Sequence, residues 1–175
     1  LEVVKAMPYK RRQNPLDCPY SQGFLDADGA VVVGVGRFVN KISLAATQIT
    51  RSPLDQVKKE LGGTIYCKPF IRGEKCRWEL RETQEVLKAL KCLETIPKKG
   101  RQVKAAIDYL ENRITGDQLA TIMNQEYKTG HRANPVKLQY QQPHTRKEGI
   151  HLATTYARKR RKRYPRKYRK ILEKR

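Results

Sequence analysis

The sequence contains no apolar stretch that approaches the ~20 consecutive residues of a membrane-spanning helix, so we expect no membrane partner. Acidic residues are scarce: 17 Asp and Glu against 38 Lys and Arg give a net charge of +21 over 175 residues. Hydrophobic residues make up only 38%, below the roughly 45–50% of globular domains, so part of the chain lies outside a core. A positive charge of this size predicts a polyanionic partner, for which nucleic acid is the default.

The four cysteines form no C-x-x-C pair, which argues against a zinc ribbon or a redox dithiol. Cys67 and Cys76 fall opposite each other in a predicted hairpin that turns at residues 71–72, so its register allows a disulfide between them. Opposed cysteines are more often only neighbours. We therefore expect four reduced thiols, as in an intracellular protein.

The excess positive charge is concentrated near the C-terminus. Residues 151–175 carry 12 basic residues and one acidic residue, whereas residues 16–115 carry 17 and 12. Body and tail therefore need separate explanations. We divide the chain into a basic N-terminal arm (1–15), a folded domain (16–128), an extended connector (129–149) and a basic tail (150–175).

Hydrophobic periodicity predicts two β-hairpins, separated and followed by helices. Strands are expected near 31–35, 41–47, 64–70 and 75–81, and helices near 52–61, 83–93, 99–114, 116–129 and 150–163. Ser52 is expected to cap its helix, with Pro53 at the first helical position. With a helix before the first strand, the order α-β-β-α-β-β-α-α indicates an α+β domain.

The two faces of the predicted sheet differ in chemistry. In the last strand, Cys76, Trp78 and Leu80 point one way, toward the core. The other face carries basic side chains: Lys41, Lys75, Arg77, Arg81 and, where the register permits, Lys68. A solvated sheet face explains such residues, and so does a concave surface that follows a nucleic-acid backbone.

Residues 21–29 read S-Q-G-F-L-D-A-D-G and run directly into a valine-rich strand. This window and the order of elements resemble the LAGLIDADG homing endonuclease family over residues 16–115. The resemblance implies the α-β-β-α-β-β-α fold and a motif helix that packs against a second copy. It also implies a carboxylate at the end of that helix that binds Mg²⁺, matched here by Asp28. Asp26 is then expected to serve packing and capping. With one motif per chain, an active enzyme requires a homodimer and a near-palindromic DNA target.

The resemblance further implies that Gln48, in a Thr-Gln pair at the end of the second strand, orders the catalytic water. A basic residue before a Gln in a later helix serves the same site, and Arg101 matches it. The candidate catalytic residues are therefore Asp28, Gln48 and Arg101. Two positions depart from the family: Gln22 replaces a small residue and is expected to obstruct helix pairing, and Pro19 shortens the motif helix. The first hairpin is also short, which limits its reach into a DNA groove.

The tail interleaves tyrosines with basic residues. Lys and Arg neutralise phosphates, and Arg and Tyr stack on exposed bases. The nucleic-acid-binding candidates of the tail are Arg158, Lys159, Arg160, Arg161, Lys162, Arg163, Tyr164, Arg166, Lys167, Tyr168, Arg169 and Lys170. A targeting address or a disordered, solubilising tail is the plainer interpretation.

Three functions fit these observations. The tail, Gln22 and the short hairpin favour an RNA-bound structural protein on a LAGLIDADG scaffold, in an organellar ribosome or a similar particle beside ribosomal proteins. An active homodimeric, Mg²⁺-dependent endonuclease for double-stranded DNA is the first alternative, and an intron maturase is the second. The resemblance, with a chain that starts at Leu1, leads us to expect an organellar location, in a mitochondrion or a chloroplast.

Overall fold

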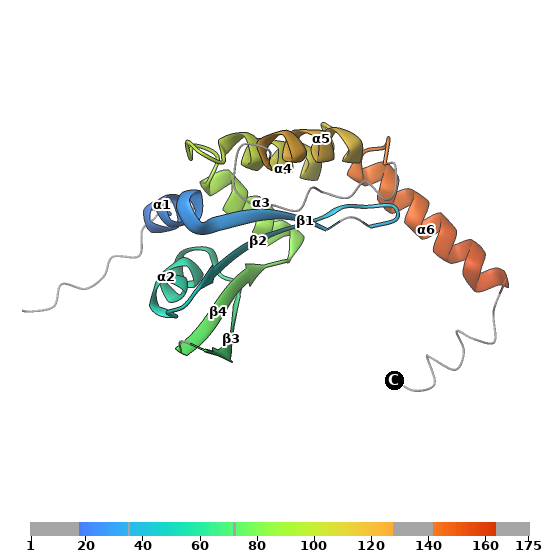
Figure 1. Cartoon of the computed structure of the whole chain (residues 1–175). Helices are drawn as coiled ribbons and strands as arrows, with labels where there is room; N and C mark the ends of the chain where they lie inside the picture. The colour runs from blue at the N-terminus through green and yellow to red at the C-terminus, as the bar shows by residue number, and fades with distance from the viewer. Residues whose placement is uncertain (1–17, 35, 72, 128–141, 164–175) are drawn as a thin grey trace, which may run out of the picture.

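The computed structural model describes residues 18–34, 36–71, 73–127 and 142–163. The predicted N-terminal arm, most of the predicted connector and residues 164–175 of the tail lie outside these ranges. The elements are α1 (Pro19–Asp28), β1 (Gly29–Gly34), β2 (Lys41–Gln48), α2 (Ser52–Leu61), β3 (Thr64–Phe70), β4 (Gly73–Leu80), α3 (Thr83–Cys92), α4 (Gly100–Leu110), α5 (Gly116–Tyr127) and α6 (Arg146–Arg163) (Figure 1). The predicted α+β order is confirmed.

The two predicted hairpins join into one antiparallel sheet with the strand order β1-β2-β4-β3. The inner strands of the two hairpins pair with each other, with Leu44 opposite Leu80. In β3 and β4, Cys67 lies opposite Cys76 and Lys68 opposite Lys75, as the predicted register requires. Lys68 therefore shares a face with the other predicted basic residues.

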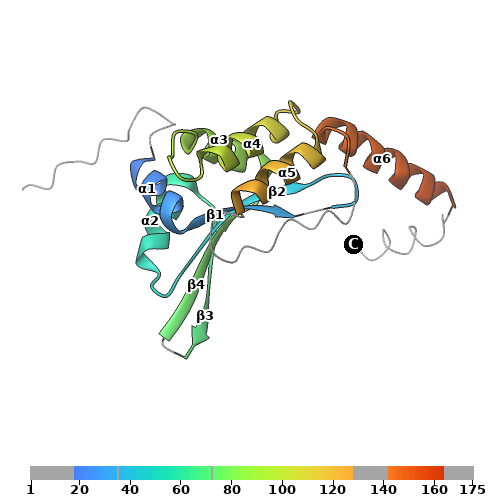
Figure 2. The same ribbon diagram turned by 45° about the horizontal axis from the view of Figure 1, so that its top comes forward.

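The core lies between the sheet and helices α3, α4 and α5, which cover one of its faces (Figures 1 and 2). Trp78 and Leu80 of β4 are fully buried there, in the same cluster as Leu90 of α3 and Val103 of α4. Helix α2 contributes Leu54 and Val57 to the same core. No described helix covers the opposite face of the sheet. None of the described helices is both long and apolar enough to span a membrane.

Two helix boundaries differ from the predictions. Helix α2 begins at Ser52, so Arg51 occupies the cap position and Ser52 is not the cap. Helix α4 ends at Leu110 instead of 114, because the chain turns at Asn112, where φ is +64°. The end of α2 at Gly62 is as predicted, since φ is +79° there and only glycine adopts this without strain.

Helix α6 begins at Arg146, four residues before the predicted helix near 150–163. A capping box sets this start: the backbone N–H of Thr145 donates to the Glu148 carboxylate at 2.8 Å, and the Glu148 N–H lies 3.4 Å from the Thr145 hydroxyl. The helix leads away from the body of the domain (Figure 2). The T-x-x-E spacing was present in the sequence and marks this helix start.

The expectation of four reduced thiols is wrong, because the structure pairs all four cysteines. Cys18 is bonded to Cys92 and Cys67 to Cys76. The second bond follows from a register that the sequence already allowed. The first joins residues 74 positions apart and depends on how α1 packs against the end of α3, which local sequence patterns do not show.

Candidate active site and nucleic-acid interface

Asp28 and Gln48 meet at one end of the sheet. Asp28 is the last residue of α1, and β1 begins at the next residue. Because Gly29 pairs with Ala46, the end of β2 lies beside the end of α1. The side-chain amide of Gln48 donates a hydrogen bond of 2.9 Å to Oδ2 of Asp28. Two of the three candidate catalytic residues are therefore in direct contact.

Asp26 has the capping role that was expected of it. Its Oδ1 accepts the backbone N–H groups of Lys98 and Lys99 at 3.0 and 3.1 Å. These are the two residues that precede α4. A carboxylate in this position satisfies backbone donors that a helix leaves unpaired at its N-terminal end. Asp26 thus ties the motif helix to α4 and leaves Asp28 as the more open carboxylate.

Lys99 is a basic residue that contacts the end of α1. Its ammonium group donates to the carbonyls of Leu25, Asp26 and Ala27 at 2.8, 2.8 and 3.1 Å. A cation there complements the negative end of the helix dipole. Burial lowers the pKa of Lys99, while the nearby Asp26 and Asp28 carboxylates act in the opposite direction.

Arg101, the predicted basic residue, is exposed on the first turn of α4, and Gln102 beside it is buried. The Arg101-Gln102 pair identified Arg101 as the basic residue of the site, and the sequence analysis did not identify Lys99. The signal for it lay two residues earlier, in the basic pair that precedes the glycine opening α4.

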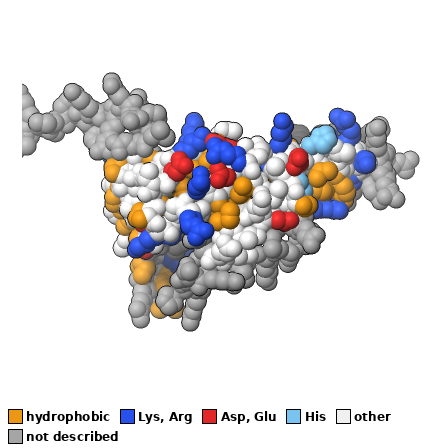
Figure 3. All heavy atoms as spheres, turned by 90° about the horizontal axis from the view of Figure 1, so that it is seen from above, with side chains coloured by type: hydrophobic (Ala, Val, Ile, Leu, Met, Phe, Trp, Pro, Cys, Tyr) orange, Lys and Arg blue, Asp and Glu red, His pale blue; other side chains and the backbone are white. Residues whose placement is uncertain are grey.

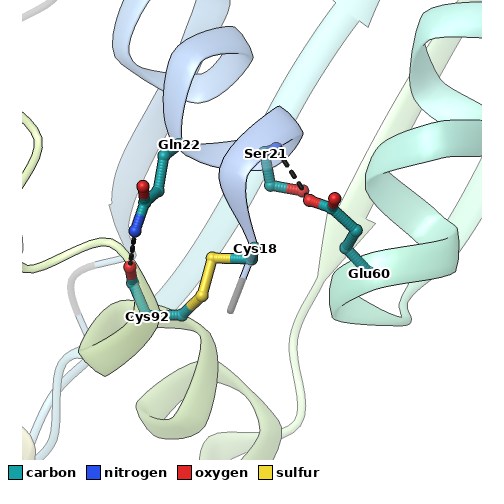
Figure 4. The surroundings of a disulfide bond; sticks show 5 residues. All are labelled: Cys18, Ser21, Gln22, Glu60 and Cys92. Carbon is teal, nitrogen blue, oxygen red and sulfur yellow. Dashed lines mark hydrogen bonds between the residues drawn. A yellow bond between two sulfur atoms is a disulfide. The ribbon is translucent and has the colours of Figure 1, made fainter. Parts of the chain in front are cut away.

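The start of α1 is held by three contacts within the chain (Figure 4). Cys18, at the cap position, is bonded to Cys92 at the end of α3. The Gln22 amide donates to the Cys92 carbonyl at 2.7 Å, and the backbone N–H of Ser21 donates to the Glu60 carboxylate at 2.8 Å. The Gln22 side chain is therefore directed toward α3, and its expected obstruction of helix pairing stays a prediction. Pro19 sits in the first turn, so the helix begins there as predicted.

Another face of α1 is open. Tyr20, Gly23 and Ala27 are exposed and recur at helical spacing. A Cβ built at Gly23 meets no atom within 4 Å. Tyr20 stacks on Phe24, with ring centroids 5.9 Å apart. This outer face combines small residues with an exposed aromatic ring, and it leads directly to Asp28.

The uncovered sheet face is basic, as predicted. Lys41, Lys75, Arg77 and Arg81 are all exposed, and the first lies on β2 while the others lie on or just after β4. Two hollows follow this face. One is lined by Thr47, Tyr66, Lys68, Lys75, Arg77 and Arg81, and the other by residues that include Lys41, Ser43 and Arg146. The face thus offers a cationic surface across both hairpins.

One carboxylate lies within this basic surface. Glu79 is only 9% exposed and accepts a hydrogen bond of 2.6 Å from Arg81, while Arg77 lies 3.8 Å away. The Arg81 hydrogen bond lowers the pKa of Glu79, and the charges of Arg81 and Arg77 act in the same direction against desolvation. Glu79 therefore stays ionised and fixes the orientation of its two arginines.

The helical layer is electrostatically different from the sheet face. Seen from above, acidic and basic side chains lie next to one another (Figure 3). Lys91 contacts Glu111 at 2.7 Å, and Arg113 contacts Asp108 at 2.7 Å. Because these cations are neutralised within the chain, the helical layer is the poorer surface for a polyanion.

Helix α6 extends the cationic surface past the first hairpin. Its residues 158–161 are basic and exposed. The Arg37 guanidinium, in the loop between β1 and β2, lies over the ring of Phe38 and over the ring of Tyr156 of α6, at 5.2 and 4.6 Å from the centroids. The side chains of residues 162 and 163 and all of residues 164–170, the rest of the predicted tail candidates, lie outside the described residues.

A divalent metal would find one carboxylate at this site in each chain. Asp28 is exposed and uses one oxygen for Gln48, so further oxygen lone pairs are available to a hard cation. Within the described part of the chain, three side chains of metal-binding type lie close together at Cys67, Glu74 and Cys76. The two cysteines form a disulfide, so neither is a thiolate ligand. Asp28 therefore offers a carboxylate that suits a hard divalent cation such as Mg²⁺, and a complete site would need further ligands.

No protein-family model matches the sequence, and no curated protein matches it. Solved structures do match. An archaeal intron-encoded homing endonuclease, I-Vdi141I, complexed with DNA, is 19% identical with a TM-score of 0.53, over 68% of this chain and 87% of that one. A LAGLIDADG meganuclease, I-AabMI, bound to uncleaved DNA, is 16% identical with a TM-score of 0.51, over 73% of this chain and 48% of that one. The chain has the LAGLIDADG homing endonuclease fold.

A further homing endonuclease, I-TnaI, is 17% identical with a TM-score of 0.50, over 70% of this chain and 93% of that one. The LAGLIDADG fold predicted from residues 21–29 and from the element order is therefore confirmed. The residues that resemble the family motif lie on α1, and Asp28 is the last residue of that helix.

Proposed function

We propose that this protein binds nucleic acid through the basic face of its sheet, and that two copies pair along α1 to form a Mg²⁺-dependent endonuclease for double-stranded DNA. The observation that carries the proposal is the Asp28–Gln48 contact at the end of a helix whose outer face is open. Two of the structures with this fold are described with DNA, which supports the choice of ligand.

Helix α1 is suited to contact with a second copy. Small residues at Gly23 and Ala27 allow two helix backbones to approach closely, and the exposed Tyr20 and the half-buried Phe24 supply apolar surface around them. A two-fold axis through this contact brings the two Asp28 carboxylates together, because each ends its own α1. Like charges at short range favour a bound cation.

The two Asp28 carboxylates would hold Mg²⁺, which activates water and stabilises the leaving oxygen of a phosphodiester when it is bound. The chain's own residues prepare the site. Gln48 fixes the orientation of the Asp28 carboxylate, and Lys99 anchors the last turn of the helix that carries it. Arg101 stays a proposed participant, from the start of α4.

The basic sheet face would position the duplex. Lys41, Lys75, Arg77 and Arg81 neutralise phosphates, and two-fold symmetry doubles this surface. Because the same face of each copy meets one half of the site, the preferred DNA sequence is near-palindromic. The first hairpin was expected to be short, but it is not: its strands have 6 and 8 residues, against 7 and 8 in the second hairpin. Both hairpins are therefore proposed to read each half-site.

The experiment is selection of cleaved molecules from a randomised duplex library, with Mg²⁺ or with a chelator. We expect one near-palindromic sequence to be enriched by the natural chain and not by Asp28→Asn. Asp55→Asn removes an exposed carboxylate of α2 and is the matched control, which should cleave normally. Equal cleavage by Asp28→Asn, or the absence of any enriched sequence with the natural chain, would refute the proposal.

The second candidate is the RNA-bound scaffold protein that the sequence analysis favoured, and α6 supports it. The exposed cations at 158–161 lie on α6, which leads away from the body of the domain (Figure 2), and they offer a further cationic surface outside the sheet. An organellar ribosome or similar particle, in a mitochondrion or chloroplast, would supply RNA and ribosomal proteins as partners, and a maturase would use the same surfaces on an intron. A monomer that binds folded RNA, and loses it when residues 158–161 become Gln, would favour this candidate.

A further inference from the structure

The outer edge of the basic sheet face carries two exposed aromatic rings. Tyr66 is 56% exposed and Phe70 is 47% exposed, and both lie on the edge strand β3. Alternate residues of a strand share a face, so these two rings and Lys68 between them project together. Exposure of large aromatic rings to water is energetically unfavourable, and a cluster of such rings on a protein surface marks a contact site.

Cations surround the two rings. Tyr66 pairs across the sheet with Arg77, and Lys68 pairs with Lys75. Tyr66 and these three basic residues line the same hollow. The Lys75 ammonium lies 5.6 Å from the centroid of the Phe70 ring, so a positive charge sits beside an aromatic face. The partner that complements this surface is therefore both anionic and aromatic.

Both rings are exposed, although the Lys75 ammonium lies over one face of Phe70, and the strands that carry them are held in place. Phe70 pairs with Gly73, which has no side chain to cover the ring from the opposite strand. The Cys67–Cys76 disulfide joins the strands between the two rings and fixes their register. The hairpin extends beyond the helical layer (Figure 1). A surface held in place before binding loses less conformational entropy when its ligand arrives.

We propose that Tyr66 and Phe70 form a stacking platform for unpaired nucleobases, with Lys68, Lys75 and Arg77 neutralising the adjacent phosphates. The platform rests on the nucleic-acid-binding function proposed above, and it adds a preference for unpaired or displaced bases next to the duplex that the same face holds. Bases inside an intact duplex have their faces covered by their neighbours, so a ring stacks only on a base that is single-stranded or displaced. Charge complementarity selects nucleic acid over an apolar protein surface.

The experiment measures binding of the full chain by fluorescence anisotropy to three probes of about 12 nucleotides: oligo-dT, an abasic strand of the same length, and a blunt duplex. We expect oligo-dT to bind about tenfold or more tightly than the abasic strand. The double variant Tyr66→Leu/Phe70→Leu keeps the apolar volume and should bind both strands equally weakly. Its affinity for the duplex should change by less than about twofold, because the cations stay.

The control is Ile71→Ala, which removes a neighbouring apolar side chain that is 94% exposed and has no ring, and which should leave all three affinities unchanged. Circular dichroism and the unfolding midpoint establish that the double variant is folded. Equal affinity of the natural chain for oligo-dT and the abasic strand overturns the platform while nucleic-acid binding stands. If the double variant and the natural chain differ in oligomeric mass without nucleic acid, the two rings form a contact between copies. That result overturns the platform. Failure to bind any probe overturns both proposals.

Discussion

The Gln48 amide donates a 2.9 Å hydrogen bond to the Asp28 carboxylate, across the junction of the motif helix and the sheet. The contact joins residues 20 positions apart and depends on the pairing of Gly29 with Ala46. An amide in this position orients the carboxylate without neutralising it. A site prepared in this way is the basis of the proposed nuclease, and five measurements test the account.

Replacing Gly23 by Leu should block pairing along α1 without unfolding the chain. No atom lies within 4 Å of the new Cβ, and loss of a helical glycine adds about 0.5–1 kcal/mol of stability. Sedimentation should show a dimer for the natural chain and a monomer for the variant, with cleavage lost. Gln56→Leu places the same side chain on an exposed position of α2 and should leave the dimer intact. A variant that stays dimeric would show that the copies meet elsewhere.

Removing two cations from the sheet face should weaken binding and its dependence on salt. For Lys75→Gln/Arg77→Gln, the slope of log affinity against log salt should fall by about two in magnitude on a duplex probe. Lys88→Gln/Lys91→Gln on α3 is the matched control, since those residues lie in the helical layer. If the two α3 substitutions lower the salt slope as much as the two sheet substitutions do, the basic sheet face is not the nucleic-acid interface.

Stability should depend on the ionisation of Glu79. Its pKa lies below the ordinary value of 4.5, mainly because Arg81 donates a hydrogen bond to it. The contribution of ionised Glu79 to the free energy of unfolding is therefore present above about pH 4.5. It is lost as the pH falls through the lower pKa that Glu79 has in the folded chain. Urea unfolding should show that the stability gap between the natural chain and Glu79→Gln narrows from about pH 7 to about pH 3.

The control for Glu79 is Glu85→Gln, an exposed carboxylate in the first turn of α3. The difference in unfolding free energy between Glu85→Gln and the natural chain should change less over the same pH interval. A gap for Glu79→Gln that stays constant or widens in acid would mean that the hydrogen bond from Arg81 does not stabilise the folded state.

The two disulfides should differ in their contribution to stability. Loss of a crosslink over 74 residues releases more chain entropy than loss of one over 9 residues, about 4 against about 3 kcal/mol. Urea unfolding of Cys18→Ser/Cys92→Ser should therefore show the larger drop, and Cys67→Ser/Cys76→Ser the smaller one. Equal unfolding free energies with and without reductant for the natural chain would mean that neither bond forms in solution.

Much of the fold could be predicted from the sequence because its signals are local. Alternation in 75–81 and the glycines at 62 and 63 defined a strand and a helix end, and the register of β3 and β4 followed from the turn. The Thr145–Glu148 capping box was a local signal too, and it was missed. The end of α4 was not predictable, since apolar residues continue to Ile114 while the backbone turns at Asn112.

The site was less predictable because its contacts are long-range. Motif matching placed Asp28 and Gln48 correctly beside each other. It could not show that Gln22 is directed toward Cys92, or that Lys99 contacts the carbonyls of α1, since both depend on how helices pack. The direction of Gln22 matters most for function, because its amide is bonded to the end of α3 and not directed to the face of α1 proposed for pairing.

The measurement that tests the central claim most directly is cleavage by mixtures of the natural chain and Asp28→Asn, refolded together at constant total protein. The claim is that each chain supplies half of one site. With equal amounts of the two chains, random pairing leaves about one quarter of the dimers with both carboxylates, so the initial rate should fall to about one quarter. A rate near one half would mean that each chain cleaves independently, and it would contradict the shared site.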